Sequence, residues 1–232
     1  MVEFAIERLE GLTFVTARLA AESMRAEAGA FCYARGDIRI HAPILPSLRD
    51  FIRASLADEA VIRPTYSGTG LVTLESSLGG FEVLRLADDA WILEPGAYWA
   101  SDPGIELTYH REPVLTALFA GEGLIYLQTK VHGTGQVVLH TKGPVEALDL
   151  PPGDRVIVEG KFVIARSANV HMSIQRATRN FWGRFTSGER AVRVFEVRGQ
   201  GVGRVLLNPS PFWRYHVMSV EEDAGSKLAR TS

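Results

Sequence analysis

The sequence predicts a mainly β protein made of three tandem units that follow one another along the chain. The first observation is a Gly-x-Gly pattern before a β-branched run, which occurs as SGTGLVTLES, HGTGQVVLHT and RGQGVGRVLLN. Its second glycine is Gly70, Gly135 and Gly201, so the steps are 65 and 66 residues. The second observation is that glycines and prolines interrupt the apolar runs at the short intervals typical of all-β folds. Self-similarity at one period is the signature of a repeat architecture.

Three other sets of landmarks keep the same order and nearly the same step. In each unit a glutamate interrupts an apolar run, an aliphatic residue opens a short strand, and a second glutamate opens the strand before the Gly-x-Gly pattern. The first set is Glu27, Glu94 and Glu159, the second is Ile38, Ile105 and Val170, and the third is Glu59, Glu122 and Glu189. Four landmarks in one order at one period indicate that a single unit was triplicated.

The Gly-x-Gly pattern predicts a hairpin connection between two strands, and not a phosphate-binding loop. A Walker-type loop precedes a helix and carries Lys and Ser or Thr after its last glycine. The segments that follow the glycines here are LVTLES, QVVLHT and VGRVLL. Such residues favour strands, and glycine supplies the positive φ that hairpin turns need. A dinucleotide-binding fold is disfavoured on the same ground, because no helix follows.

The three units span about residues 10–78, 79–148 and 149–218. A unit of this size does not readily bury a two-faced core alone. We therefore expect the units to pack about a pseudo-threefold axis as one body, residues 1–218, with one shared core. Residues 219–232 lack apolar periodicity, which predicts a flexible C-terminal tail.

One short helix is expected in the first unit. Leu48, Phe51, Ile52 and Leu56 fall on one helical face, and Ser47 is placed to cap its N-terminus. The corresponding segments of the other two units predict a turn or a single helical turn.

The composition excludes several classes of protein. Hydrophobic residues make up 46% and charged residues 22% of the chain, and the net charge is −2, so no overall basic field attracts nucleic acid. Cys32 is the only cysteine, which excludes an internal disulfide and a thiolate metal cluster. The chain shows no secretory signal pattern and no apolar run long enough to cross a bilayer. We expect a cytoplasmic protein with no transmembrane segment.

Several segments resemble the altered-inheritance-of-mitochondria, or mitochondrial biogenesis, protein family. They are AEAGA at 26–30 with Phe31, LEPGAY at 93–98, FAGEGL at 119–124 and GTGQVVLHT at 133–141. The resemblance covers roughly residues 10–218, and the bacterial members of the family are mostly uncharacterised. It implies three tandem copies of a short double-stranded β-helix, similar to the tryptophan RNA-binding attenuation protein. It supplies no catalytic residues to transfer.

This chain departs from the family pattern in two units. The family's typical glycine-rich segment is intact only in the second unit, as FAGEG. The first unit has ADEA at 57–60 and the third has TSGER at 186–190. If that glycine-rich loop forms a functional surface, only its second copy is complete here.

The histidines offer one weak candidate for a metal site. None of the six forms the H-x-H or H-E-x-x-H spacing of a metal site. His132 and His140 flank the second predicted hairpin, and Glu122 is near them in sequence, so a bound metal is one interpretation. The other is two edge or surface histidines. Cys32 follows Phe31 in an apolar strand and is expected to be a buried, inert thiol. The sequence names no catalytic residue and implies no cofactor.

The recurring glutamates Glu59, Glu122 and Glu189 have two interpretations. If the units are related by a pseudo-axis, the three carboxylates occupy equivalent points and converge on a cation or share protons. Alternatively, each accepts backbone N–H groups in its own glycine-rich turn.

Basic and aromatic residues alternate late in the chain and form a possible partner surface: Arg179, Phe181, Trp182, Arg184 and Phe185. Such a segment can stack and neutralise RNA, touch a membrane surface, bind a protein partner, or cap the end of the core. RNA binding is the least favoured of these because lysine is scarce and the net charge is negative.

These observations favour a non-enzymatic, β-rich scaffold or assembly protein that acts through a surface and self-associates or binds a protein partner. Whether the protein has enzymatic activity is left open. The main alternative is a small-ligand or metal-binding β-helix protein with catalysis included, and the second alternative is RNA binding.

Overall fold

The computed structural model describes residues 2–42, 63–111, 127–176 and 191–209. Antiparallel strands make up most of these residues, and one 3-10 turn, η1 at Gly160–Phe162, is the only helical element among them. The mainly β prediction is therefore confirmed. The helix expected around Phe51 and the tail at 219–232 lie outside the described residues. No helix of the described residues is long and apolar enough to cross a membrane.

The strands fall into three groups along the chain, which we call the first, second and third group. The first group is β1 (Glu3–Leu9), β2 (Leu12–Ala26), β3 (Phe31–His41) and β4 (Thr65–Leu74). The second group is β5 (Phe81–Leu93), β6 (Tyr98–Ser101), β7 (Ile105–Arg111) and β8 (Leu127–His140). The third group is β9 (Glu146–Leu150), β10 (Arg155–Val158), β11 (Val163–Ser167), β12 (Val170–Arg176), β13 (Ala191–Val197) and β14 (Gly203–Leu207).

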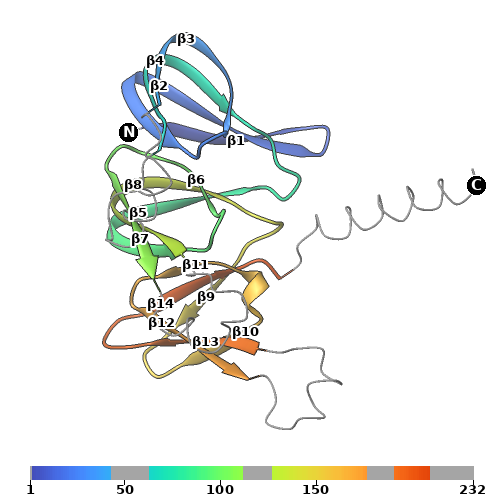
Figure 1. The fold of residues 1–232 in the computed structure, drawn as a ribbon, viewed down its shortest axis with the longest axis vertical. Helices are drawn as coiled ribbons and strands as arrows, with labels where there is room; N and C mark the ends of the chain where they lie inside the picture. The colour runs from blue at the N-terminus through green and yellow to red at the C-terminus, as the bar shows by residue number, and fades with distance from the viewer. Residues whose placement is uncertain (1, 43–62, 112–126, 177–190, 210–232) are drawn as a thin grey trace, which may run out of the picture.

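The groups follow one another along the longest axis of the molecule, as Figure 1 shows. One open sheet of eleven strands has the main order β3-β4-β2-β6-β8-β5-β11-β14-β9, and β10, β13 and β12 form a second sheet. The second group pairs with both of the others. A closed arrangement about a pseudo-threefold axis would also join the first group to the third. No strand pairing among the described residues does so.

The first and second groups are each organised around a long antiparallel strand pair with a bulge at a corresponding place. The pair is β2 with β4 in the first group and β5 with β8 in the second, and the register shifts at Ala20/Glu22 and at Ala87/Asp89. The residue inside each bulge, Ala21 or Asp88, has positive φ, 57° and 64°. Gly153, with φ 85°, joins β9 to β10 in the third group. These three residues are 67 and 65 positions apart.

The hairpin interpretation of the Gly-x-Gly pattern is wrong for the first two groups. Gly70 lies inside β4, where it faces Leu19 of β2 and Gly36 of β3, and Gly135 lies inside β8. A Cβ on Gly70 would stand 2.2 Å from the Arg35 carbonyl oxygen, so the glycine permits a close approach of two backbones. Gly201 lies in the connection from β13 to β14, two strands that belong to different sheets.

The buried apolar residues form three clusters, where the sequence had suggested one shared core. The first cluster combines Leu19, Val72 and Leu74 with Ala100 and Val138 of the second group. The second cluster, around Leu93 and Leu139, includes Ile164 and Leu206 of the third group. The third cluster is built around Phe195 and Met172. Two of the three cores therefore extend into the group that follows.

The close approach at Gly70 predicts that Gly70→Ala strongly destabilises the protein. Its Cβ would overlap the Arg35 carbonyl oxygen, and we expect a loss of about 3 kcal/mol or more in the free energy of unfolding. The matched control is Gly29→Ala, because Gly29 also has positive φ (85°) but open space around it. We expect about 1 kcal/mol there, from backbone strain alone. Urea unfolding measures both, and equal losses would contradict the close-approach explanation.

Candidate functional site

Most of the residues singled out in the sequence lie outside the described residues. These are the recurring glutamates Glu59, Glu122 and Glu189 and the basic-aromatic set Arg179, Phe181, Trp182, Arg184 and Phe185. Their convergence and their use as a surface remain predictions. Among the described residues, no group of three or more His, Cys, Asp or Glu side chains is arranged to hold a metal ion. Cys32 is exposed on β3, so the expectation of a buried thiol is wrong.

The structure does not bring His132 and His140 together. Both lie on β8, eight residues apart, which is about 26 Å along an extended strand. The His132 side chain is about half exposed, and its Nε2 lies 3.9 Å from Asp88 Oδ1 at the bulge of β5. His140 is half-buried at the far end of the strand. The expectation that the two histidines meet assumed a hairpin between them. It is wrong, because β8 is continuous from one histidine to the other.

His140 forms one wall of a cavity of about 440 Å³ between the first and second groups. Its ring centroid is 5.1 Å from that of Trp99 and 5.5 Å from that of Phe81, so three rings pack together. Glu75, Ser77 and Lys142 add polar groups to the lining. Aromatic walls with a few polar groups are the usual make-up of a small-molecule site.

The polar contacts of Ser77 decide what His140 can do chemically. Ser77 Oγ lies 2.7 Å from His140 Nε2, the contact that a serine nucleophile makes with its base. The same Oγ accepts the backbone N–H groups of Gly79 and Gly80, at 3.0 and 3.3 Å. Both oxygen lone pairs are therefore engaged, and the hydroxyl proton is left for Nε2. Burial, aided by the charge of Lys142, lowers the pKa of His140 and favours the neutral ring. The pair ties a turn to the end of β8.

A second polar cluster lies where the second and third groups meet. Glu94 follows β5, and its carboxylate is 2.8 Å from Arg193 Nη1 of β13 and accepts a 2.8 Å hydrogen bond from Gln128 Nε2 of β8. The three side chains are largely buried. Arg166 of β11 lies close by and donates to the Val170 carbonyl oxygen at 2.7 Å. Burial lowers the pKa of Arg166 to about 10, against the favourable charge of Glu94.

The junction of the first and second groups has a related arrangement. Glu27 follows β2 and is 2.9 Å from Arg63 Nη2, and the Arg63 guanidinium lies 5.6 Å from the centroid of the Tyr98 ring. Burial raises the pKa of Tyr98 to about 12. Arg25 of β2 donates to the carbonyl oxygens of Pro103 and Ile105 in the second group. Arg166 binds the Val170 carbonyl oxygen at the second junction in the same way. Ile105 and Val170 are 65 residues apart, so the two carbonyls hold corresponding positions.

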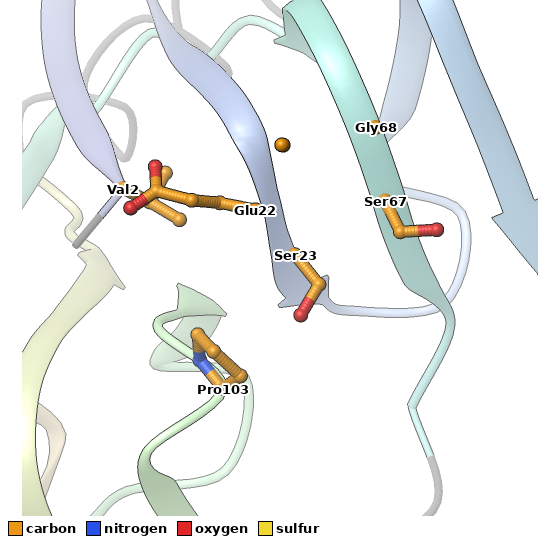
Figure 2. Close-up of a pocket in the computed structure, with 7 residues that line it drawn as sticks. Val2, Glu22, Ser23, Ser67, Gly68 and Pro103 are labelled. Carbon is orange, nitrogen blue, oxygen red and sulfur yellow. The ribbon is translucent and has the colours of Figure 1, made fainter.

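Backbone hydrogen bonds hold Val2 at the first junction, beside a pocket of about 520 Å³ that Figure 2 shows. Its backbone N–H donates to Asp102 Oδ1 at 2.9 Å, and its carbonyl accepts from Gln136 Nε2 at 3.1 Å. Asp102 Oδ2 also accepts the Gln136 backbone N–H at 2.7 Å. Glu22 and Ser67 stand around the pocket on β2 and β4 (Figure 2). The buried Asp102 thereby links the second group to the start of the chain.

Sequence reasoning recognised Glu27 and Glu94 as landmarks but missed their partners. Arg63, Gln128 and Arg193 are each 65 residues apart, so the repeat step itself was the signal that would have found them. Arg63 and Gln128 face the glutamate of their own group, whereas Arg193 reaches the glutamate of the preceding one. Ser77 carried no sequence signal, because its role depends on a turn at Gly79 and Gly80.

The fold and these junctions define an all-β, antiparallel protein whose polar clusters lie where one strand group meets the next. A model of the mitochondrial biogenesis AIM24 family matches residues 4–210, and the chain belongs to this family. A bacterial protein from Streptococcus pyogenes, solved by X-ray crystallography in a structural genomics programme, has a similar structure. The structural alignment covers 100% of both chains, with a TM-score of 0.70 and 20% sequence identity, so this similarity supports the fold alone. A search of curated proteins finds no match to this chain.

The lowered pKa of His140 predicts a defined pH dependence of stability. The unfolded chain takes up a proton near the ordinary pKa of 6.5, while the folded protein resists it. The contribution of the neutral His140 ring to the free energy of unfolding is therefore complete above pH 6.5. It decreases as the pH falls from 6.5 towards the lower pKa of the folded state. The difference in free energy of unfolding between wild type and His140→Gln should shrink between about pH 7.5 and about pH 5 in urea titrations.

The control for this measurement is His132→Gln, which removes an exposed ring on the same strand. This variant should keep the wild-type dependence on pH. A difference between wild type and His140→Gln that stays constant with pH would contradict the assignment of a buried neutral imidazole.

Proposed function

We propose that this chain is a non-enzymatic scaffold or assembly protein made of three tandem β units, and that it works through its surface and not through a reaction centre. The units correspond to the three strand groups, each a short double-stranded β-helix of the kind found in the tryptophan RNA-binding attenuation protein. The proposal places the protein in the cytoplasm, with a protein partner or a second copy of itself as its ligand.

The observation that carries the proposal is a strand pairing that occurs twice. Arg25 and Ala26 at the end of β2 pair with Ser101 and Ala100 of β6. At the end of β5, Ile92 pairs with Arg166 and Leu93 with Ala165, both of β11. Each residue of the second set follows its counterpart by 67 or 65 positions. The chain thus uses one junction to attach successive units, which is how a modular scaffold grows.

The internal partners of the buried polar groups support a structural role. Glu94 is engaged by Arg193 and Gln128, the Asp102 carboxylate by two backbone amides, and Ser77 Oγ by two backbone amides and a histidine. Groups fixed in this way hold strands and turns in place. A catalytic group needs instead to present a lone pair or a proton to a bound substrate.

The cavity lined by Trp99 and His140 favours a second candidate function, the binding of a small aromatic or planar ligand. Its volume of about 440 Å³ and its wall of aromatic rings suit such a molecule. Metal binding would need Glu122, which lies outside the described residues, and RNA binding would need the equally undescribed Arg179–Phe185 segment. These remain weaker alternatives.

Native mass spectrometry of gently purified protein, before and after denaturation, separates the scaffold from the ligand-binding function. If the protein is a scaffold, each assembly should have a native mass that is a whole multiple of the chain mass. Denaturation should then release no bound small molecule. A small passenger lost on denaturation would contradict it and favour the cavity. Trp99→Ala is the control that locates the passenger, because the variant should then lose the added mass. Trp91→Ala, which removes a tryptophan elsewhere in the second group, should keep it.

A further inference from the structure

The two internal junctions share more than their strand pairs. Beside each pair the backbone N–H of a glutamate donates to the short strand of the next group. Glu27 N–H donates to the Trp99 carbonyl oxygen at 2.7 Å, and Glu94 N–H donates to that of Ile164 at 2.9 Å. Each junction therefore has a donor half, the end of a long strand with its glutamate, and an acceptor half, a short strand of the following group.

The third group carries a donor half with nothing docked on it. By the 65-residue step, Ile157, Val158 and Glu159 correspond to Ile92, Leu93 and Glu94. Within the described residues, β10 pairs with β13 on one side and with no strand on the other. Ile157 is 53% exposed, whereas Ile92 at the same place in the occupied junction is 4% exposed. The difference is what removal of a docked strand would produce.

The first group carries the matching acceptor half. Phe31, Cys32 and Tyr33 correspond to Tyr98, Trp99 and Ala100 of β6, 67 residues later. The backbone is shaped alike, because the register shifts at Phe31/Tyr33 in β3 and at Tyr98/Ala100 in β6. β3 ends the eleven-stranded sheet, so its outer edge has no partner strand among the described residues. Tyr33 is 47% exposed, whereas Ala100 is fully buried.

The two halves lie at opposite ends of the molecule, β3 at one end and β10 at the other (Figure 1). They therefore cannot meet within one chain. We propose that a second copy of this chain docks head to tail, with the β10 edge of one copy on the β3 edge of the next, and so continues the internal junction between molecules. This inference rests on the proposed scaffold function and names its partner. The contact is heterologous, so it builds a ring or a filament.

The internal pairings fix the register of this contact. The pairs Ala26 with Ala100 and Leu93 with Ala165 place Val158 opposite Tyr33 of the second copy. Ile157 then lies opposite Ala34, and Glu159 N–H donates to the Cys32 carbonyl oxygen. An edge strand with exposed apolar side chains is a ready template for such pairing.

The contact between copies differs from the internal junctions in one respect. The guanidinium that binds a carbonyl at each internal junction comes from Arg25 or Arg166, and the corresponding positions here are Ile157 and Ala34. The contact is therefore apolar at its centre and buries no arginine. We expect association that tolerates salt and varies with protein concentration.

Sedimentation velocity over a range of concentrations tests the contact with Ile157→Asp and Tyr33→Asp. A carboxylate at either position must be desolvated on docking, and each variant should raise the apparent dissociation constant at least tenfold. Val202→Asp is the matched control, because Val202 is 62% exposed but lies in the connection from β13 to β14, outside both β10 and β3. It should assemble as wild type does. Unchanged urea midpoints show that the variants remain folded.

Mixing the two variants is the sharper test. Ile157→Asp keeps an intact β3 edge and Tyr33→Asp keeps an intact β10 edge. A head-to-tail contact therefore predicts a one-to-one dimer of the two variants that grows no further. A contact that uses the same surface on both copies predicts no dimer when the two variants are mixed. If the mixture forms no dimer, the proposal is overturned.

A disulfide provides a direct readout of register. Glu159→Cys places a thiol beside the native Cys32 of the second copy, at a Cα separation suited to a disulfide. Mild oxidation should link chains covalently, and the Glu159→Cys, Cys32→Ser double variant should stay unlinked. Wild type that keeps the 25.5 kDa monomer mass at every concentration, with no cross-link, would overturn self-docking.

The remaining results separate this inference from the proposed function. Assembly that neither aspartate affects would overturn the head-to-tail contact and leave a scaffold that self-associates elsewhere. A small passenger seen by native mass spectrometry would instead contradict the scaffold itself.

Discussion

The pairing of each long strand's end with a short strand of the next group is the interaction on which the rest of the structure depends. It involves only two or three residue pairs at each junction, Arg25 and Ala26 in one and Trp91 to Leu93 in the other. Such a short ladder holds because one apolar core extends across each junction. Each apolar side chain buried across a junction contributes about 1.5–3 kcal/mol. The second group is thereby held on both sides, and the outer groups on one side each.

Buried charge at the junctions defines how the groups fit together. A guanidinium in a largely buried site costs desolvation, and this burial lowers the pKa of Arg166. Arg166, on a short strand, and Arg25, on a long strand, offset this cost by donating hydrogen bonds to corresponding carbonyl oxygens. Glu94 and Arg193 add an ion pair between groups. Such pairs stabilise weakly against apolar replacements but penalise any misaligned docking, which leaves a charge unpaired.

The sequence predicted the β class because glycine and β-branched residues carry local information. It could not tell where Gly70 would lie, since a glycine needed for a close approach of strands looks the same as one needed for a turn. The error about His132 and His140 followed from that one, because a straight strand separates residues that a hairpin would bring together. The Glu94–Arg193 pair joins residues 99 positions apart, and only the repeat step pointed to it. The engaged lone pairs of Ser77 depend on turn geometry that no spacing reveals.

The most direct test of this account is amide hydrogen exchange, measured by NMR, at three corresponding positions. The amides of Glu27 and Glu94 are hydrogen-bonded across junctions, whereas Glu159 has no acceptor for its amide among the described residues. We expect slow exchange at Glu27 and Glu94 in dilute protein, and fast exchange at Glu159 that slows as the protein concentration rises. Exchange at Glu94 as fast as at Glu159 would contradict the claim that one junction joins the groups.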